Sequence, residues 1–147
     1  MPQFARPDAD TTLGNYQNQA GGTTNIFQAI DESTASDADY IRSPASPVNE
    51  VYVCRLSDVT DPALSTGHIM RMRTAVDQAA QEALDFTQQL RQGYVSEGTQ
   101  GTLIASQSRT GVTSTTFTDS AYTLSGAEAD AITDYTALFF RFNINKP

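Results

Sequence analysis

The chain is poor in the residues from which disulfides, metal sites and nucleophilic sites are built. Its 147 residues include one cysteine, Cys54, one histidine, His68, and no tryptophan. A single cysteine excludes an intramolecular disulfide and a zinc site built on paired cysteines. Any serine–histidine or cysteine–histidine pair would have to use His68. We therefore expect a non-enzymatic protein with no catalytic residue, no cofactor and no bound metal.

Basic residues are also few, because nine Lys and Arg stand against seventeen Asp and Glu, a net charge of −8. An acidic chain repels phosphate backbones, so we expect no nucleic-acid partner. No apolar run approaches the roughly 20 residues that a membrane-spanning helix requires. Residues 1–7 lack the basic and apolar regions of a secretory signal. We expect synthesis in the cytoplasm and no membrane partner.

The sequence does contain many stretches in which apolar and polar residues alternate, the pattern of half-buried strands. Residues 51–56, 68–76 and 137–144 show it, and the last is so apolar that we expect it at the centre of a sheet. Shorter or Thr-rich stretches predict further strands at 25–30, 102–107 and 112–124, with a turn at 108–111. The spacing of turn signals predicts an all-β fold, a two-sheet antiparallel sandwich of the jelly-roll type, in one domain over 8–147.

Residues 75–90 fit two patterns. Ala75, Val76, Ala83 and Leu84 fall at helical spacing, as do 79 and 80, which predicts an amphipathic helix. The alternative is a hairpin that turns within 77–82 and continues as a strand with Leu84, Phe86, Gln88 and Leu90 inward. The strands expected on both sides favour the second interpretation. A capping box at Ser125 and Glu128 predicts one short helix over 126–132.

The N-terminal region has little to bury. Residues 8–25 fit either a flexible tail or a first edge strand anchored by Leu13 and Tyr16. We interpret residues 1–7 as an arm that becomes ordered only on a partner. Its candidate contact residues are Pro2, Gln3, Phe4 and Arg6.

The remaining candidate residues have ordinary structural interpretations. His68 is expected to be an exposed histidine, and Cys54 a small core residue. The carboxylates at 31, 32, 37, 39, 58 and 61 are expected to be solvated, with a bound cation as the alternative. Four arginines, Arg71, Arg73, Arg91 and Arg141, could line one sheet face and contact an acidic neighbouring subunit. Three tyrosines could stack on sugars from an exposed position: Tyr16, Tyr40 and Tyr94.

Several short runs together resemble a β-sandwich found among the virion proteins of tailed bacteriophages. The runs are Arg6-Pro7-Asp8, Gly14-Asn15-Tyr16, NIFQAIDE at 25–32, DYIRSP at 39–44, GHIMRMR at 67–73, QLRQG at 89–93 and ADAITDY at 129–135. The resemblance spans about residues 6–145, and its motifs are structural rather than catalytic. The chain departs from the pattern at Tyr16, where tryptophan is expected, and at 76–83, which is Ala-rich where a Gly-rich turn is expected.

The resemblance implies a virion component, with residues 84–90 as a strand. A small acidic module with an N-terminal arm fits a capsid decoration, or cement, protein on the outer surface of the virion. Its partner would be the major capsid protein, bound by a homotrimer. The alternative is a tail- or fibre-associated module, with a role in carbohydrate binding. A hydrolase centred on His68 is the third hypothesis.

Overall fold

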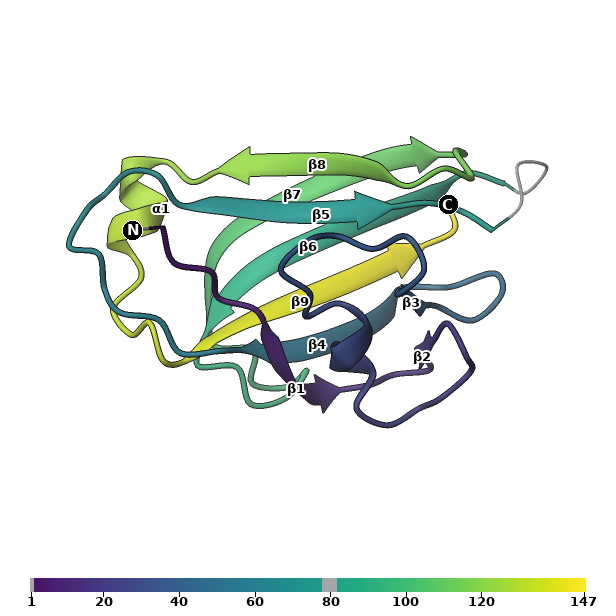
Figure 1. Cartoon of the computed structure of the whole chain (residues 1–147), viewed down its shortest axis with the longest axis horizontal. Helices are drawn as coiled ribbons and strands as arrows, with labels where there is room; N and C mark the ends of the chain where they lie inside the picture. The colour runs from purple at the N-terminus through teal and green to yellow at the C-terminus, as the bar shows by residue number, and fades with distance from the viewer. Residues whose placement is uncertain (1, 78–81) are drawn as a thin grey trace.

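The computed structural model describes residues 2–77 and 82–147, which form an all-β fold with one short α-helix (Figure 1). In chain order the elements are β1 (Pro7–Thr12), β2 (Gln17–Asn18), the 3-10 helix η1 (Ile26–Ala29), β3 (Ile41–Arg42), β4 (Glu50–Leu56), β5 (Ile69–Thr74), β6 (Leu84–Gln92), β7 (Thr102–Val112), β8 (Thr118–Thr123), α1 (Gly126–Asp130) and β9 (Leu138–Asn145). The predicted all-β sandwich is thereby confirmed.

The larger sheet contains five strands in the order β1-β4-β9-β6-β7, and every neighbouring pair is antiparallel. β9 lies at its centre, as its apolar sequence predicts. Phe142 sits opposite Tyr52 of β4 on one side and Gln88 of β6 on the other. Because side chains alternate along a strand, Leu138, Phe140, Phe142 and Ile144 share the inner face of this sheet.

The second layer is smaller and is built from two separate parts (Figure 1). β5 and β8 form a two-stranded antiparallel sheet, and the side chain of Gln88 in β6 reaches the backbone of Arg71 in β5. β2, β3 and η1 form the other part of this layer, where η1 contacts β1. Five strands are therefore faced by two short sheets rather than by one continuous sheet.

The main core lies between these layers and is rich in aromatic side chains. Tyr16 and Tyr52 are almost completely buried, and their ring centroids lie 5.7 Å apart in a tilted arrangement. Ile26, Cys54 and Met70 belong to the same buried cluster. Contacts of this kind add to the free energy gained by burying the rings. Tyr16 joins the N-terminal region to the core, so residues 7–18 are part of the domain.

The strand predicted at 25–30 is wrong, because Ile26–Ala29 forms the 3-10 helix η1. The carboxylate of Asp10 accepts hydrogen bonds from the backbone N–H groups of Ile26 and Phe27, both at 2.9 Å. A free helix N-terminus has such unpaired donors, and a carboxylate satisfies them. The apolar residues Ile26 and Ala29 are both buried one 3-10 turn apart.

The turn predicted at 108–111 is also wrong, since β7 continues without a break to Val112. Its partner β6 is long enough to pair with it through Arg109 and Val112. Gly111 has φ +66°, and its N–H donates to the carboxylate of Asp85 at 2.9 Å. The strand predicted over 112–124 is correspondingly shorter, with β8 confined to Thr118–Thr123.

Residues 84–92 form β6, which confirms the strand interpretation over the helix for this part of the stretch. Phe86, Gln88 and Leu90 are buried, as the alternation predicts. The predicted turn within 77–82 falls mostly on 78–81, which lie outside the described residues.

The predicted capping box is present at the start of α1. The Ser125 hydroxyl accepts from the Glu128 N–H, and the Glu128 carboxylate accepts from the Ser125 N–H at 2.7 Å. The bond donated to this carboxylate by the Ser125 N–H, and a second donated by the Ser125 hydroxyl at 2.8 Å, lower the pKa of Glu128. The helix ends at Asp130, two residues earlier than predicted, and Ile132 is buried just beyond it.

Candidate functional site

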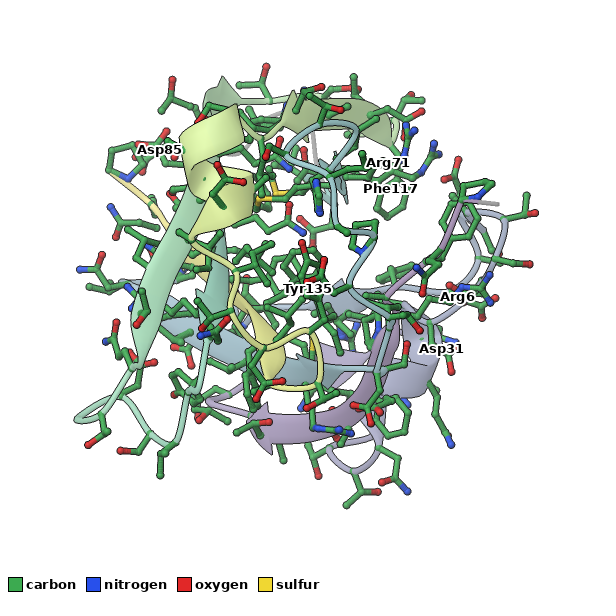
Figure 2. The ribbon with its side chains drawn as sticks, turned by 90° about the vertical axis from the view of Figure 1, so that its left-hand side faces the viewer. Arg6, Asp31, Arg71, Asp85, Phe117 and Tyr135 are labelled. Atoms are coloured by element: carbon green, nitrogen blue, oxygen red, sulfur yellow. The ribbon has the colours of Figure 1, made fainter. Side chains whose placement is uncertain are left out.

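A large groove lies between the two layers, with a volume of about 970 Å³. We call it the intersheet groove. Its floor comes from β6 and β9, and one wall is formed by 68–74, which includes all of β5. The opposite wall comes from the arm, residues 2–7, and from the segment 29–41. Figure 2 labels four residues that border this groove: Arg6, Arg71, Phe117 and Tyr135.

The floor is more exposed than the centre of a sandwich is expected to be. Phe140, Phe142 and Ile144 lie on the inner face of the central strand, yet each is only partly buried. Large apolar side chains in such a position are normally covered by the facing sheet. Here the facing layer leaves space between β5 and the segment 29–41, so these side chains border the groove.

The arm is held on its own domain. Gln3 and Thr60 bond reciprocally: the Gln3 side chain donates to the Thr60 carbonyl at 2.9 Å, and its oxygen accepts from the Thr60 N–H at 2.8 Å. The Ser57 N–H donates to the Arg6 carbonyl at 2.7 Å. An arm ordered only on a partner is therefore not what the structure shows for residues 2–7, and Pro7 begins β1. Met1 lies outside the described residues.

Exposed apolar side chains gather around the groove. The described residues include six large hydrophobic side chains that are exposed, and three of them border it: Phe4 (64% exposed), Leu64 and Ile69. Phe4 belongs to the predicted contact arm and is stacked by the guanidinium of Arg6, 5.8 Å from its centroid. Of the other predicted contact residues, Pro2 and Gln3 are exposed and Arg6 is partly buried. Clustered apolar exposure is typical of protein-binding surfaces.

His68 lies at one end of the groove and is paired with a tyrosine. Its Nε2 shares a hydrogen bond of 2.8 Å with the Tyr135 hydroxyl, and the two rings lie 5.9 Å apart. Its Nδ1 is buried and has no hydrogen-bond partner among the described residues. Burial, and then Asp61 and Asp130, raise the pKa of Tyr135. His68 is thus less exposed than the sequence predicts, and no described carboxylate, serine or cysteine bonds to its ring.

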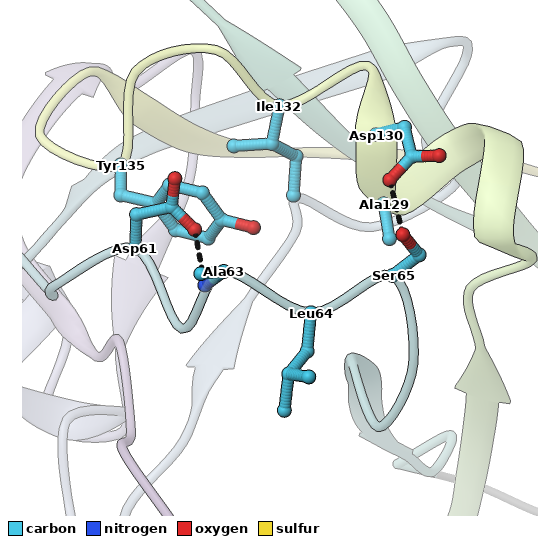
Figure 3. A pocket seen from close by; sticks show the side chains of 8 residues that line it. All are labelled: Asp61, Ala63, Leu64, Ser65, Ala129, Asp130, Ile132 and Tyr135. Carbon is cyan, nitrogen blue, oxygen red and sulfur yellow. Dashed lines mark hydrogen bonds between the residues drawn. The ribbon is translucent and has the colours of Figure 1, made fainter.

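A second, smaller pocket of about 230 Å³ lies between the 61–65 loop and α1 (Figure 3). Its two carboxylates are already engaged. Asp61 accepts from the Ala63 N–H at 2.7 Å, and Asp130 accepts from the Ser65 hydroxyl. The first bond closes a turn within the loop, the second holds the loop against the helix, and together they explain this pair of acids structurally.

Cys54 is completely buried, as predicted, and burial raises the pKa of its thiol. Other predicted cation-binding carboxylates lie in ion pairs, with Asp37 next to Arg73 and Asp58 next to Arg55. Within 2–77 and 82–147, no group of three or more His, Cys, Asp or Glu could hold a metal ion. None of the helices in the described part of the chain is long and apolar enough to cross a membrane.

The four arginines do not share one face. Arg71 and Arg73 lie on β5, whereas Arg91 and Arg141 belong to the five-stranded sheet. Arg73 pairs with Asp37 and Asp119, and Arg141 pairs with Glu97 at 2.6 Å. Their positions alternate with apolar residues in every strand, but this pattern does not say which sheet a strand joins.

The prediction of an exposed tyrosine is wrong at two of the three positions, since Tyr16 is 1% and Tyr94 is 4% exposed. Tyr94 belongs to the loop between β6 and β7, which covers the outer face of the large sheet. Its ring packs on Phe139, and its hydroxyl bonds to Glu97 at 2.9 Å. Tyr40 remains partly exposed and packs on Phe117. The aromatic platforms expected of a sugar-binding surface are therefore reduced to one.

The groove could not be identified from the sequence. Alternation places Phe140 and Phe142 on one face of their strand, and only the layer arrangement shows that a groove opens above them. A usable signal was present in the long polar segment 31–47, which supplies too few apolar residues to complete a second sheet.

Comparison with known proteins adds no identification: no protein-family model, no curated protein and no solved structure matches this chain.

Proposed function

We propose that the chain is a non-enzymatic virion structural protein that decorates the outer surface of a tailed-bacteriophage capsid. The motifs named above, from Arg6-Pro7-Asp8 to the run at 129–135, support the viral context. One structural observation supports a protein-binding role: Phe4, Leu64 and Ile69 are exposed and border the intersheet groove. These side chains can be buried only by contact with another surface.

The proposed partner is the major capsid protein, and the proposed binding unit is a homotrimer. A protein that binds the assembled shell more tightly than free capsid subunits shifts the equilibrium toward the shell by mass action. The stabilisation then grows with the interface that each copy buries. The net charge of −8 fits an external position, because packaged DNA repels an acidic protein.

The tail- or fibre-associated alternative loses part of its support in carbohydrate binding. Tyr16 and Tyr94 are buried and cannot stack on a sugar. We therefore place the decoration role ahead of it.

In the experiment, the purified chain is added to capsids of the encoding phage that were prepared without this protein. Electron microscopy and gel densitometry then measure how many copies of the chain bind to each capsid. The chain is expected to bind the outer shell. Phe4→Ser should reduce occupancy, whereas Val95→Ser, which alters a 70% exposed apolar residue away from the groove, should not. Both variants must first show the same thermal unfolding as the parent. Failure of the parent chain to bind any capsid surface overturns the proposal.

A further inference from the structure

β5 has one edge that pairs with no other strand in the described part of the chain. Its register with β8 places Ile69 opposite Thr123, Arg71 opposite Ala121 and Arg73 opposite Asp119. The N–H of Leu124 donates to the carbonyl of His68 at 2.9 Å. Hydrogen-bonded and non-hydrogen-bonded pairs alternate in an antiparallel ladder. Residues 70, 72 and 74 therefore bond to β8, and the backbone groups of 69, 71 and 73 point away from it.

This free edge forms a wall of the intersheet groove. All residues from His68 to Thr74 border the groove. Because the side chains of a strand alternate between two faces, this is expected only if the edge of the strand itself faces the groove. Figure 1 shows β8 running alongside β5, and these two strands make up the whole of their sheet in the described part of the chain. Within 2–77 and 82–147, the only hydrogen bond to this edge comes from the Gln88 side chain, whose Nε2 donates to the Arg71 carbonyl at 3.1 Å.

The chemistry of the groove selects its occupant. Its floor is apolar, with Phe140 and Phe142 partly exposed, while its β5 wall carries the backbone N–H groups of Ile69, Arg71 and Arg73. A hydrocarbon chain would make apolar contacts with the floor, but it would bury those N–H donors without a hydrogen-bond acceptor, which costs free energy. An extended peptide offers apolar side chains to the floor and carbonyls to the edge at the same spacing as a strand.

We propose that the intersheet groove binds an extended segment of a partner protein, which adds to the free edge of β5 as a third strand. The segment alternates apolar side chains, directed at the floor, with polar ones directed outward. β5 is six residues long, so the segment needs about six residues, roughly 20 Å. The inference rests on the proposed function only in assuming that the groove binds protein.

The charge on β5 adds one further requirement for the segment. Arg71 is exposed and forms no ion pair with any described carboxylate, whereas its neighbour Arg73 pairs with Asp119 and Asp37. Opposite charges on directly facing residues of neighbouring strands attract each other. The outward face of the segment should therefore carry an acidic side chain across from Arg71.

The test measures amide hydrogen exchange of the full chain by NMR, with and without a synthetic peptide. The peptide alternates valine with threonine, has one central glutamate on its polar face and carries terminal lysines for solubility. Binding should slow exchange by about tenfold at Ile69, Arg71 and Arg73, whose amides face the groove. Exchange at Met70 and Met72, which already bond to β8, should not change. A control peptide with the same side chains and N-methylated alternate residues should give no protection.

Two variants separate backbone pairing from side-chain contact. Arg71→Ala removes the charge and keeps the N–H, so it should retain most of the binding. Arg71→Pro removes the N–H on the open edge, where proline is tolerated, and should abolish binding. Equal protection by the two peptides, or protection elsewhere with unchanged exchange at 69, 71 and 73, overturns the inference. Binding of oleate in place of either peptide would also contradict it.

The same measurement on the chain bound to capsids distinguishes this inference from the proposed function. Capsid binding with unprotected β5 amides contradicts strand addition and leaves the decoration role standing. Protection of β5 by the peptide, together with no binding to capsids, supports strand addition and contradicts the decoration role.

Discussion

The side chain of Gln88 donates from Nε2 to the backbone carbonyl of Arg71, 3.1 Å away, and so joins the floor of the groove to its β5 wall. Gln88 is buried, and its Oε1 accepts from the Gln107 amide at 2.5 Å. The Ser120 hydroxyl donates in turn to Gln107 at 3.1 Å. One polar network thus fixes β5 and β8 over β6 and β7, because each buried group depends on its partners.

Replacing Gln88 with leucine should destabilise the fold by about 1–3 kcal/mol, because the amide of Gln107 loses its acceptor in a buried site. Urea unfolding followed by circular dichroism measures the change. The double variant Gln88→Leu with Gln107→Leu should recover part of the loss, since both amides are then removed. A double variant less stable than the sum of the two single ones would contradict this account of the network.

Asp10 connects the first strand, the 3-10 helix and the core. Its carboxylate accepts from the N–H groups of Ile26 and Phe27 and from the Tyr52 hydroxyl at 2.8 Å. Asp10→Ala leaves these donors without their acceptor and should cost about 2–4 kcal/mol in thermal or urea unfolding. Asp8 lies in the same strand as Asp10 and is the partly exposed partner of Arg55. Asp8→Ala should therefore cost less than about 1 kcal/mol. Equal losses would show that Asp10 acts only through its charge.

The ion pair of Glu97 with Arg141 makes stability depend on pH. Hydrogen bonding from Arg141 lowers the pKa of Glu97 below its ordinary value of 4.5, although partial burial opposes the shift. A lowered folded pKa contributes stability above about pH 4.5 that is lost as the pH falls through the folded value. At pH 7, Glu97→Gln should therefore lose up to about 1 kcal/mol, a modest figure because Glu97 is partly exposed.

The difference between the parent and Glu97→Gln should shrink as the pH falls below about 4.5, because the carboxylate is then progressively protonated. Urea unfolding at a series of pH values measures it. In an Arg141→Met background the substitution should have little effect at any pH. A constant difference from pH 7 down to acid would rule out the charge as its cause.

Cys54 should react with thiol reagents only when the protein unfolds. Its side chain is completely buried, its Sγ lies 3.9 Å from the Phe140 carbonyl, and burial raises the pKa of the thiol. Reagents attack the thiolate, and burial both blocks their access to Cys54 and disfavours its ionised form. As a control, Ala45→Cys places a thiol at an exposed position, and this thiol should react at once. Labelling of Cys54 at a rate independent of added urea would contradict this burial.

The sequence predicts most of the strands because alternation acts locally. Residues 51–56 and 137–144 each carry a complete apolar face, and β4 and β9 follow them closely. The 3-10 helix was missed because its carboxylate acceptor, Asp10, lies sixteen residues before Ile26 in the chain. β7 continues beyond the predicted turn because β6 offers it backbone partners up to Leu84. A local sequence pattern does not indicate which residues so far away in the chain become hydrogen-bonding partners.

The groove could not be predicted, for a related reason. Alternation shows that Phe140 and Phe142 face inward, but the cover over them depends on how many strands the opposite layer contains. In the described part of the chain, that layer has only β5 and β8 on one side, because the segment 31–40 is polar and forms no strand. The arm residues were predicted as a contact region, but their attachment to Thr60 depends on a loop more than fifty residues away.

The number of copies in each virion tests the central claim most directly. Quantitative mass spectrometry of purified particles should find this chain in a fixed ratio to the major capsid protein, close to one copy per capsid subunit or to one trimer per local three-fold position. A handful of copies per particle, as expected for a tail or fibre component, or none at all, would contradict the decoration role.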